Sequence, residues 1–454
     1  MSVSAPERGG SSTYWAEHAW LSAEAGTRHG VLIEIEAGRF TAVRDGVTAP
    51  PAGATRLAGL TLPGLANAHS HAFHRALRGR THAGKGTFWT WRERMYDLAA
   101  RLTPEAYHAL ARATFAEMAH AGVTCVGEFH YLHHGPGGTR YADANEMGHR
   151  LIAAAAEAGI RITLLDTLYL TADVDGAPLS GAQLRFSDGD LTGWWSRVQE
   201  LRTPPHARTG AAAHSVRAVP AGLLAEFASC TGDLSVHIHL SEQRRENEAC
   251  LAVHGRTPTQ LLVENGLAGP SVTAVHATHL TDDDRTALGD TGTRVCLCPT
   301  TERDLADGIG PARALADAGS SLCLGSDSHA VIDLFEEARA VELDERLRDE
   351  HRGHFDVAEL LTAATVAGHA SLGWDDAGTI AAGARADLVT VRLDTVRTAG
   401  CDLDQAPAAA VFAASAADVH HVVVDGREIV RDGVHLLVDD VGRALDESIR
   451  AAWA

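Results

Sequence analysis

The sequence has almost no lysine: of its 39 basic residues, only Lys85 is not an arginine. Acidic residues outnumber basic ones, and the formal net charge is −20. Such a surface repels nucleic acid and anionic membranes, so we expect neither as a partner. The charge does not exclude a small anionic substrate, provided that the substrate pocket carries arginines of its own.

Long apolar runs and paired cysteines are also missing. No stretch of about 18 apolar residues is present, which argues against a membrane span. The seven cysteines are dispersed without a C-x-x-C pair, so we expect no disulfide framework. The start of the chain lacks a basic segment followed by an apolar one, so we expect no secretory signal and a cytoplasmic location.

Helix-like and β-rich segments alternate through the middle of the chain, which is typical of parallel strands joined by crossover helices. The β-rich segments are LTLPGLANAHSH, VTCVGEFHYL, RITLLDTLYL, ARTGAAAHSV, LSVHIHLSE, SVTAVHATHL, TRVCLCPT and SLCLGSDSH. Eight such units predict an α/β protein with a closed (β/α)8 barrel of the TIM type. No G-x-G-x-x-G follows an early strand, which disfavours a Rossmann sheet.

Both ends of the chain are rich in short strands and tight turns instead. GTIAAGARADLVTVRLD and DVHHVVVDGREIVRDGVHL, near the C-terminal end, include an Asp-Gly turn pair. The simplest architecture joins residues 1–62 and 374–454 into one small β-sandwich domain. Residues 63–373 then form the barrel.

The polar residues that are candidates for chemistry stand where β-rich segments end, which in an α/β barrel is the catalytic rim. They follow strands 1, 5, 6 and 8 in the order His69 and His71, His239 and Glu242, His276, and Asp327. His69 and His71 are two residues apart on a strand, so their imidazoles face one side and can share a metal ion.

Each of these residues has a plainer interpretation, in which it forms a rim hydrogen bond that holds a loop. His237 lies deeper on the face of His239, and a packed core histidine is at least as good an interpretation for it as a ligand. Zinc accepts imidazole nitrogen and carboxylate oxygen. A glutamate near the metal, such as Glu242, is the usual proton shuttle for a metal-activated water. The recurrence of such signals at four strand ends favours a metal site.

The order H-x-H, H-x-x-E, H, D resembles the amidohydrolase superfamily in its deaminase branch. LPGLANAHSH, CPTTERDLADG, LGSDSH and GARADLV look like the usual segments of that branch. HSHAFHRALRG, FWTWRERMY, GEFHYLHH and AAHSVRAV resemble more specifically the formimidoylglutamate deiminase family of histidine degradation. The similarity extends from about residue 14 to residue 435.

This resemblance implies a single-metal hydrolase. Its metal ligands would be His69, His71, His239 and Asp327, holding one Zn²⁺, although Fe²⁺ or Mn²⁺ also suits such a site. Asp327 and His276 would take up a proton from the attacking water, and Glu242 would protonate the imine nitrogen. Two-metal relatives commonly use a carboxylated lysine on a middle strand, which this chain cannot supply because Lys85 follows strand 1.

The implied substrate, N-formimidoyl-L-glutamate, is a dicarboxylate amidine whose hydrolysis yields N-formyl-L-glutamate and ammonia. A guanidinium can grip a carboxylate through two parallel hydrogen bonds. The resemblance assigns this part to Arg92 and Arg217, and further substrate contacts to Tyr131, His214 and His74. At position 74 the family pattern often has glutamine. A salt bridge with Glu93 is the alternative interpretation of Arg92. The family also implies a homodimer.

Two other functions fit parts of the pattern. A deaminase of this branch acting on a nucleobase or a guanidine-like group would need aromatic and amide contacts in place of the two arginines. A catalytically dead barrel serving as a scaffold would typically have lost metal ligands. Here every ligand and the shuttle glutamate are present, which favours an enzyme.

Overall fold

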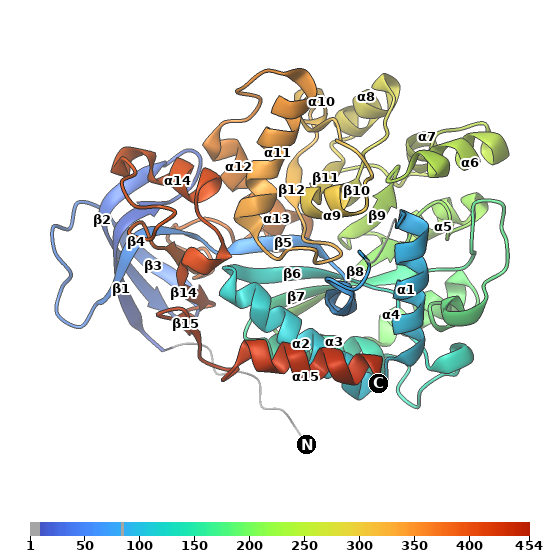
Figure 1. The fold of residues 1–454 in the computed structure, drawn as a ribbon, viewed down its shortest axis with the longest axis horizontal. Helices are drawn as coiled ribbons and strands as arrows, with labels where there is room; N and C mark the ends of the chain where they lie inside the picture. The colour runs from blue at the N-terminus through green and yellow to red at the C-terminus, as the bar shows by residue number, and fades with distance from the viewer. Residues whose placement is uncertain (1–9, 83–85) are drawn as a thin grey trace.

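Within the part of the chain that the structure describes, the strands form two sheets of eight strands each. The computed structural model describes residues 10–82 and 86–454, so Lys85 lies outside the described residues. One sheet comes from the middle of the chain and the other from its two ends. Figure 1 shows them side by side, with the end-derived sheet in blue and red.

The sheet from the middle of the chain is parallel, and its strands follow one another in sequence order. They are β5 (Leu65–Ser70), β6 (Val123–His130), β7 (Arg161–Leu168), β8 (Ala207–Ala213), β9 (Val236–Leu240), β10 (Val272–His276), β11 (Arg294–Leu297) and β12 (Leu322–Leu324). A bridge between Ser70 and Asp327 joins the first strand to the loop after the last and closes the ring. The predicted (β/α)8 barrel is confirmed.

Helices surround the barrel (Figure 1). The α-helices are α1 (Phe88–Arg101), α2 (Pro104–His120), α3 (Glu146–Ala158), α4 (Leu191–Glu200), α5 (Leu224–Thr231), α6 (Arg244–His254), α7 (Pro258–Glu264), α8 (Asp282–Asp290), α9 (Pro299–Asp304), α10 (Ala312–Ala318), α11 (Leu334–Asp349), α12 (Val357–Ala364), α13 (Val366–Ser371), α14 (Ala406–Phe412) and α15 (Val441–Trp453). The Thr103 side chain caps α2 by accepting a hydrogen bond from the Ala106 amide. α3 ends at Gly159, whose φ of 82° suits glycine. Among the described residues, no helix is long and apolar enough to cross a membrane.

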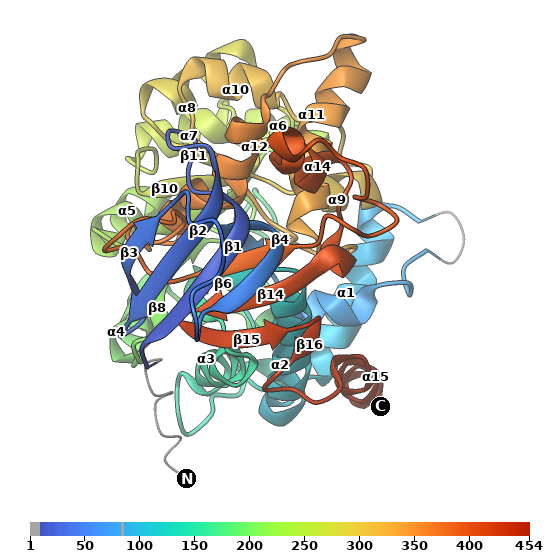
Figure 2. The same ribbon diagram turned by 90° about the vertical axis from the view of Figure 1, so that its left-hand side faces the viewer.

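The second sheet unites the two chain ends. Its strands are β1 (Ser12–Trp20), β2 (Thr27–Glu36), β3 (Arg39–Arg44), β4 (Thr55–Pro63), β13 (Leu388–Val391), β14 (Val419–Val424), β15 (Arg427–Arg431) and β16 (Val434–His435). Antiparallel pairing of β4 with β13 joins the N-terminal strands to the C-terminal ones. Figure 2 shows this sheet face on. The fold class predicted from the sequence is confirmed, and the boundaries at residues 62–63 and 373–374 stay a prediction.

Buried contacts lock the second sheet to the barrel. Arg161, the first residue of β7, donates through Nη1 to Asp387 Oδ1 at 2.8 Å, and both side chains are almost fully buried. At the chain end, α15 lies along α2 (Figures 1 and 2), and Trp453 donates its indole N–H to the carbonyl of Ala76 at 3.0 Å. The barrel mouth, where the candidate residues stand, is therefore carried on a rigid frame.

Candidate metal centre and pocket

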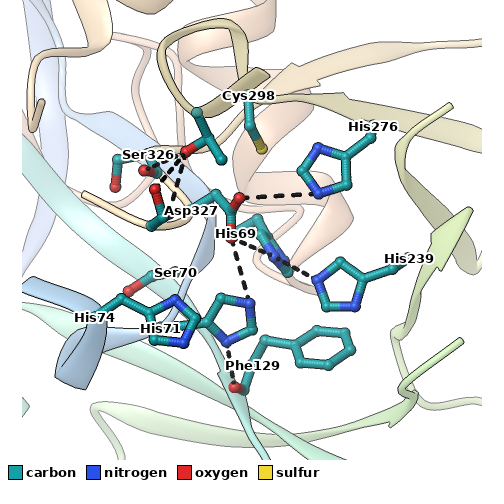
Figure 3. A network of polar contacts seen from close by, with 12 residues as sticks. His69, Ser70, His71, His74, Phe129, His239, His276, Cys298, Ser326 and Asp327 are labelled. Atoms are coloured by element: carbon teal, nitrogen blue, oxygen red, sulfur yellow. Dashed lines mark hydrogen bonds and ion pairs between the residues drawn. The ribbon is translucent and has the colours of Figure 1, made fainter. Parts of the chain in front are cut away.

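Four side chains that are far apart in the sequence meet at the mouth of the barrel (Figure 3). We call His69, His71, His239 and Asp327 the metal cluster; all four are buried. Asp327 Oδ1 lies 3.3 Å from Nε2 of His69 and 3.3 Å from Nε2 of His71. Nε2 of His239 lies 3.2 Å from Nε2 of His69. One carboxylate oxygen and three imidazole nitrogens thus surround a single point.

The hydrogen bonds around the metal cluster orient its imidazoles as ligands. His71 donates through Nδ1 to the carbonyl of Phe129 at 2.9 Å, and His239 donates through Nδ1 to the carbonyl of His214 at 2.8 Å. Because a carbonyl only accepts, each Nδ1 carries the hydrogen and each Nε2 presents a lone pair to the centre. Burial also lowers the pKa of His69 to about 3, which keeps that ring neutral. Converging lone pairs and a carboxylate fit a divalent cation.

Unusual backbone conformations aim the strand-end residues into the mouth. Ser241 after β9, His276 at the end of β10 and Asp327 after β12 have φ values of 51°, 70° and 41°. Left-handed backbone at residues other than glycine costs about 1–3 kcal/mol each and gathers at functional sites. The sequence carries no pattern that reveals this strain.

His276 lies between three carboxylates beside the metal cluster. Its Nε2 is 3.9 Å from Glu242 Oε1 and 3.8 Å from Asp327 Oδ2, and its Nδ1 is 3.3 Å from Glu302 Oε1. Burial opposes a charge on this ring, but the surrounding carboxylates outweigh it and raise the pKa of His276 to about 10. The sequence reasoning missed Glu302, whose only signal is its place in CPTTE after the seventh strand.

The proposed substrate contacts line one pocket next to the metal cluster. These residues are His74, Arg92, Tyr131, His214 and Arg217. Among the described residues Arg92 forms no ion pair with Glu93; its Nε donates instead to the Tyr96 hydroxyl at 2.7 Å. His74 shares a hydrogen bond of 2.9 Å with the Tyr131 hydroxyl.

Arg217 is held by two glutamates. Its Nε lies 2.9 Å from Glu246 Oε2, and its Nη2 lies 3.5 Å from Glu242 Oε2. The other oxygen of Glu246 accepts a hydrogen bond from the Ser241 amide at 2.9 Å, which fixes the carboxylate in place. Sequence reasoning missed Glu246, whose only signal is its position four residues after Glu242.

Side chains of α1 form one wall of the pocket. They are Phe88, Trp91, Met95 and Tyr96, and the cavity has a volume of about 50 Å³. Sites for small organic ligands usually occupy about 300–1,000 Å³. A substrate therefore has to displace side chains of this wall as it binds.

Three other buried histidines form hydrogen bonds that stabilise the fold around the barrel. His237 donates through Nε2 to the carbonyl of Ser371 at 3.1 Å, as expected for a packed core histidine. His133 donates through Nε2 to the carbonyl of Thr167 at 2.9 Å, and His134 shares a hydrogen bond of 3.0 Å with Asp188. These bonds account for the histidines of the loop after β6.

The family model for the amidohydrolase family matches residues 60–429, a range that includes the whole metal cluster. The chain belongs to this family. It is 39% identical over 438 residues to a formimidoylglutamate deiminase of Pseudomonas aeruginosa, covering 93% of this chain and 96% of that protein.

Two solved structures share the whole fold. An amidohydrolase from Brucella melitensis is 32% identical and superposes with a TM-score of 0.88, over 98% of this chain and 100% of its own. An adenosine deaminase from Xanthomonas campestris with bound zinc is 25% identical and superposes with a TM-score of 0.83, over 98% of each chain.

Proposed function

We propose that this protein is a metal-dependent hydrolase that converts N-formimidoyl-L-glutamate into N-formyl-L-glutamate and ammonia. One observation carries the proposal: Arg92 and Arg217 stand in one buried pocket beside the metal cluster, in a protein with a net charge of −20. Two guanidiniums match the two carboxylates of this substrate. The identity of 39% to a formimidoylglutamate deiminase supports the same assignment.

The metal ion that we propose is Zn²⁺, with Fe²⁺ or Mn²⁺ as alternatives, and the metal cluster would hold it. Three imidazole nitrogens and one carboxylate oxygen are a donor set that zinc accepts, and the neighbour with bound zinc supports this choice. When bound, such an ion lowers the pKa of water from 15.7 to about 7, which supplies a nucleophile at neutral pH.

Residues of the chain provide the proton transfers. We assign the proton of the attacking water to Asp327. His276, whose Nε2 lies 3.8 Å from Asp327 Oδ2 and whose raised pKa keeps the ring a hydrogen-bond donor, orients that water. Glu242 delivers a proton to the imine nitrogen as the water oxygen adds to the formimidoyl carbon. As the C=O bond forms, Glu242 takes up the remaining hydroxyl proton and delivers it to the same nitrogen, which leaves as ammonia, and the proton held at Asp327 then restores Glu242. Burial raises the pKa of Glu242 above its ordinary value, which favours the protonated form that this role requires.

The arginines orient the substrate. Arg217 reaches across to Glu242, so a carboxylate bound to Arg217 sets the distance between the formimidoyl group and the shuttle. Arg92, on α1, lines the same pocket, and its guanidinium forms no ion pair among the described residues. We assign the second carboxylate to Arg92.

A deaminase acting on a nucleobase is the second candidate. The aromatic side chains Trp91, Tyr131, Tyr169 and Phe186 line the pocket, and an aromatic ring can stack on them. The likeness to an adenosine deaminase points the same way.

Ammonia release distinguishes the two candidates. The purified protein with measured metal content is offered N-formimidoyl-L-glutamate, its neutral diamide, adenosine and guanine. We expect release from the dicarboxylate and a much lower kcat/KM for the diamide. Release from a nucleobase alone would replace the proposal with the second candidate. We also propose that the protein is a cytoplasmic homodimer. Cell fractionation tests the location, and analytical ultracentrifugation tests the oligomeric state.

A further inference from the structure

A second cavity, far larger than the catalytic pocket, lies where the second sheet meets the barrel. Its volume is about 460 Å³. Its walls come from the β2–β3 turn, the connection from α3 to β7, and the β14–β15 turn. Figure 2 shows α3 below β15, on this side of the molecule. Because β7 begins here, the cavity opens at the end of the barrel opposite the metal cluster.

Four arginines line this cavity, although the protein as a whole is strongly acidic. They are Arg39, Arg161, Arg385 and Arg427, and Asp425 is the one acidic residue among the lining residues. Two further carboxylates, Asp376 and Asp387, pair with these arginines from behind. Four guanidiniums face three carboxylates, so the cavity keeps a surplus of positive charge.

Structural ion pairs account for only part of this charge. Arg161 donates hydrogen bonds through its two Nη atoms to Asp387 and Asp425. Its buried Nε has no acceptor among the described residues. Arg385 binds Asp376 through Nε at 3.0 Å and Asp425 through Nη1 at 2.9 Å. Within the described ranges, the Arg427 guanidinium has no hydrogen bond or ion pair at all. The contacts between the second sheet and the barrel therefore do not depend on the Arg427 guanidinium.

We propose that this cavity binds a small organic anion, whose carboxylate or phosphate group is held by Arg427 and by Arg385, which lines the cavity and keeps its Nη2 free among the described residues. Guanidinium forks match the oxygens of either group. The volume of about 460 Å³ lies within the range of sites for small organic ligands. The site lies outside the catalytic pocket and is independent of the proposed function.

Isothermal titration of the full-length, metal-loaded protein tests this proposal. The probes are citrate for the carboxylate source, AMP for the phosphate source, and adenosine as the uncharged counterpart of AMP. We expect saturable binding of citrate or AMP, and whichever binds identifies the anionic group. Adenosine binding as tightly as AMP would overturn the proposal, as would the absence of binding by both anions.

Two variants locate the binding. Arg427→Gln removes the unpaired guanidinium and should weaken binding at least tenfold. Arg431→Gln is the matched control on the same strand, because Arg431 is outside the cavity lining and pairs with Glu428. It should leave the affinity unchanged. Unaltered unfolding temperatures without ligand show that both variants fold. Affinity that survives Arg427→Gln but is lost in Arg217→Ala would assign the ligand to the catalytic pocket and overturn the proposal.

Discussion

Gly325 lies where the last barrel strand closes against the backbone of His69, a residue of the metal cluster. It follows β12 and packs against the backbone of His69. A Cβ atom added at Gly325 would lie 2.7 Å from His69 Cβ, 2.9 Å from its carbonyl oxygen and 3.0 Å from its nitrogen. Real Cβ atoms essentially never come closer than 3.0 Å to such neighbours, and ordinary contact begins at 3.4 Å.

Gly325→Ala therefore has to separate β12 from β5 by several tenths of an ångström. Forcing a methyl group into a packed core costs about 1–3 kcal/mol. The same shift moves His69 away from Asp327, although metal sites tolerate only about ±0.2 Å in their distances. Perturbing the surroundings of metal ligands typically lowers affinity by about 10- to 100-fold. We expect a loss of this size for zinc, together with the loss of stability.

Competition with a chromophoric chelator measures the zinc affinity, and denaturant unfolding of the metal-free protein measures the stability. Gly310→Ala is the matched control, because a Cβ at Gly310 meets its nearest neighbour at 3.7 Å and the position is also in the barrel-mouth loops. It should leave both quantities nearly unchanged. If Gly325→Ala bound zinc with unaltered affinity, the inference that strand closure sets the metal geometry would be refuted.

Further predictions concern the shuttle, the arginines, the buried ion pairs and the metal. Glu242→Gln should lower kcat at least about 100-fold, as expected for lost acid–base catalysis, while metal analysis finds unchanged zinc. Arg217→Ala should lower kcat/KM for the dicarboxylate by about 10- to 100-fold through a higher KM. The reason is that a hydrogen bond to a charged group contributes about 1.5–3 kcal/mol. Steady-state kinetics, with the neutral diamide as the control substrate, checks this prediction. Asp166→Asn should destabilise the protein by about 3–5 kcal/mol in urea unfolding at pH 7, because it breaks the buried pair with Arg197, whose Nη1 lies 2.7 Å from Asp166 Oδ2. Burial alone would raise the pKa of Asp166, but Arg197 outweighs it and holds the pKa at about 2. This stabilisation is complete above the unfolded pKa near 4 and is lost as the pH falls through about 2, so wild type and variant should converge over that range. Chelation should abolish ammonia release, and added zinc should restore it; activity that survives complete removal of metal would contradict the proposed chemistry.

The barrel was predictable because its signals are local. Each strand is a short apolar run, and each candidate ligand stands at its end or just after it, so strand order alone brings His69 and His239 to the same rim. Alternation between strand faces also predicts that His69 and His71 share a side. These inferences need only the period of a strand and the direction of parallel chains.

The partners of the catalytic residues were not predictable in this way. Glu302 reaches His276 from the short helix α9, and Glu246 reaches Arg217 from the first turn of α6. Each pairing depends on how a helix begins after its strand, and no sequence periodicity encodes that geometry. The left-handed φ of Asp327 is a second example, because the closure between β5 and β12 imposes it from a distance.

The ion pair between Arg217 and Glu246 has a consequence for selectivity. An arginine buried without a partner would cost several kcal/mol, so Glu246 allows the free enzyme to keep a cation in the pocket. A substrate carboxylate has to compete with Glu242 and Glu246 for this guanidinium, which lowers the affinity for every anion. A neutral amidine, however, offers nothing to exchange for those contacts. Because this competition weakens the binding of anions and leaves uncharged substrates unaffected, Glu246 limits the preference for the dicarboxylate, and Glu246→Gln should widen the difference in kcat/KM between the dicarboxylate and its diamide.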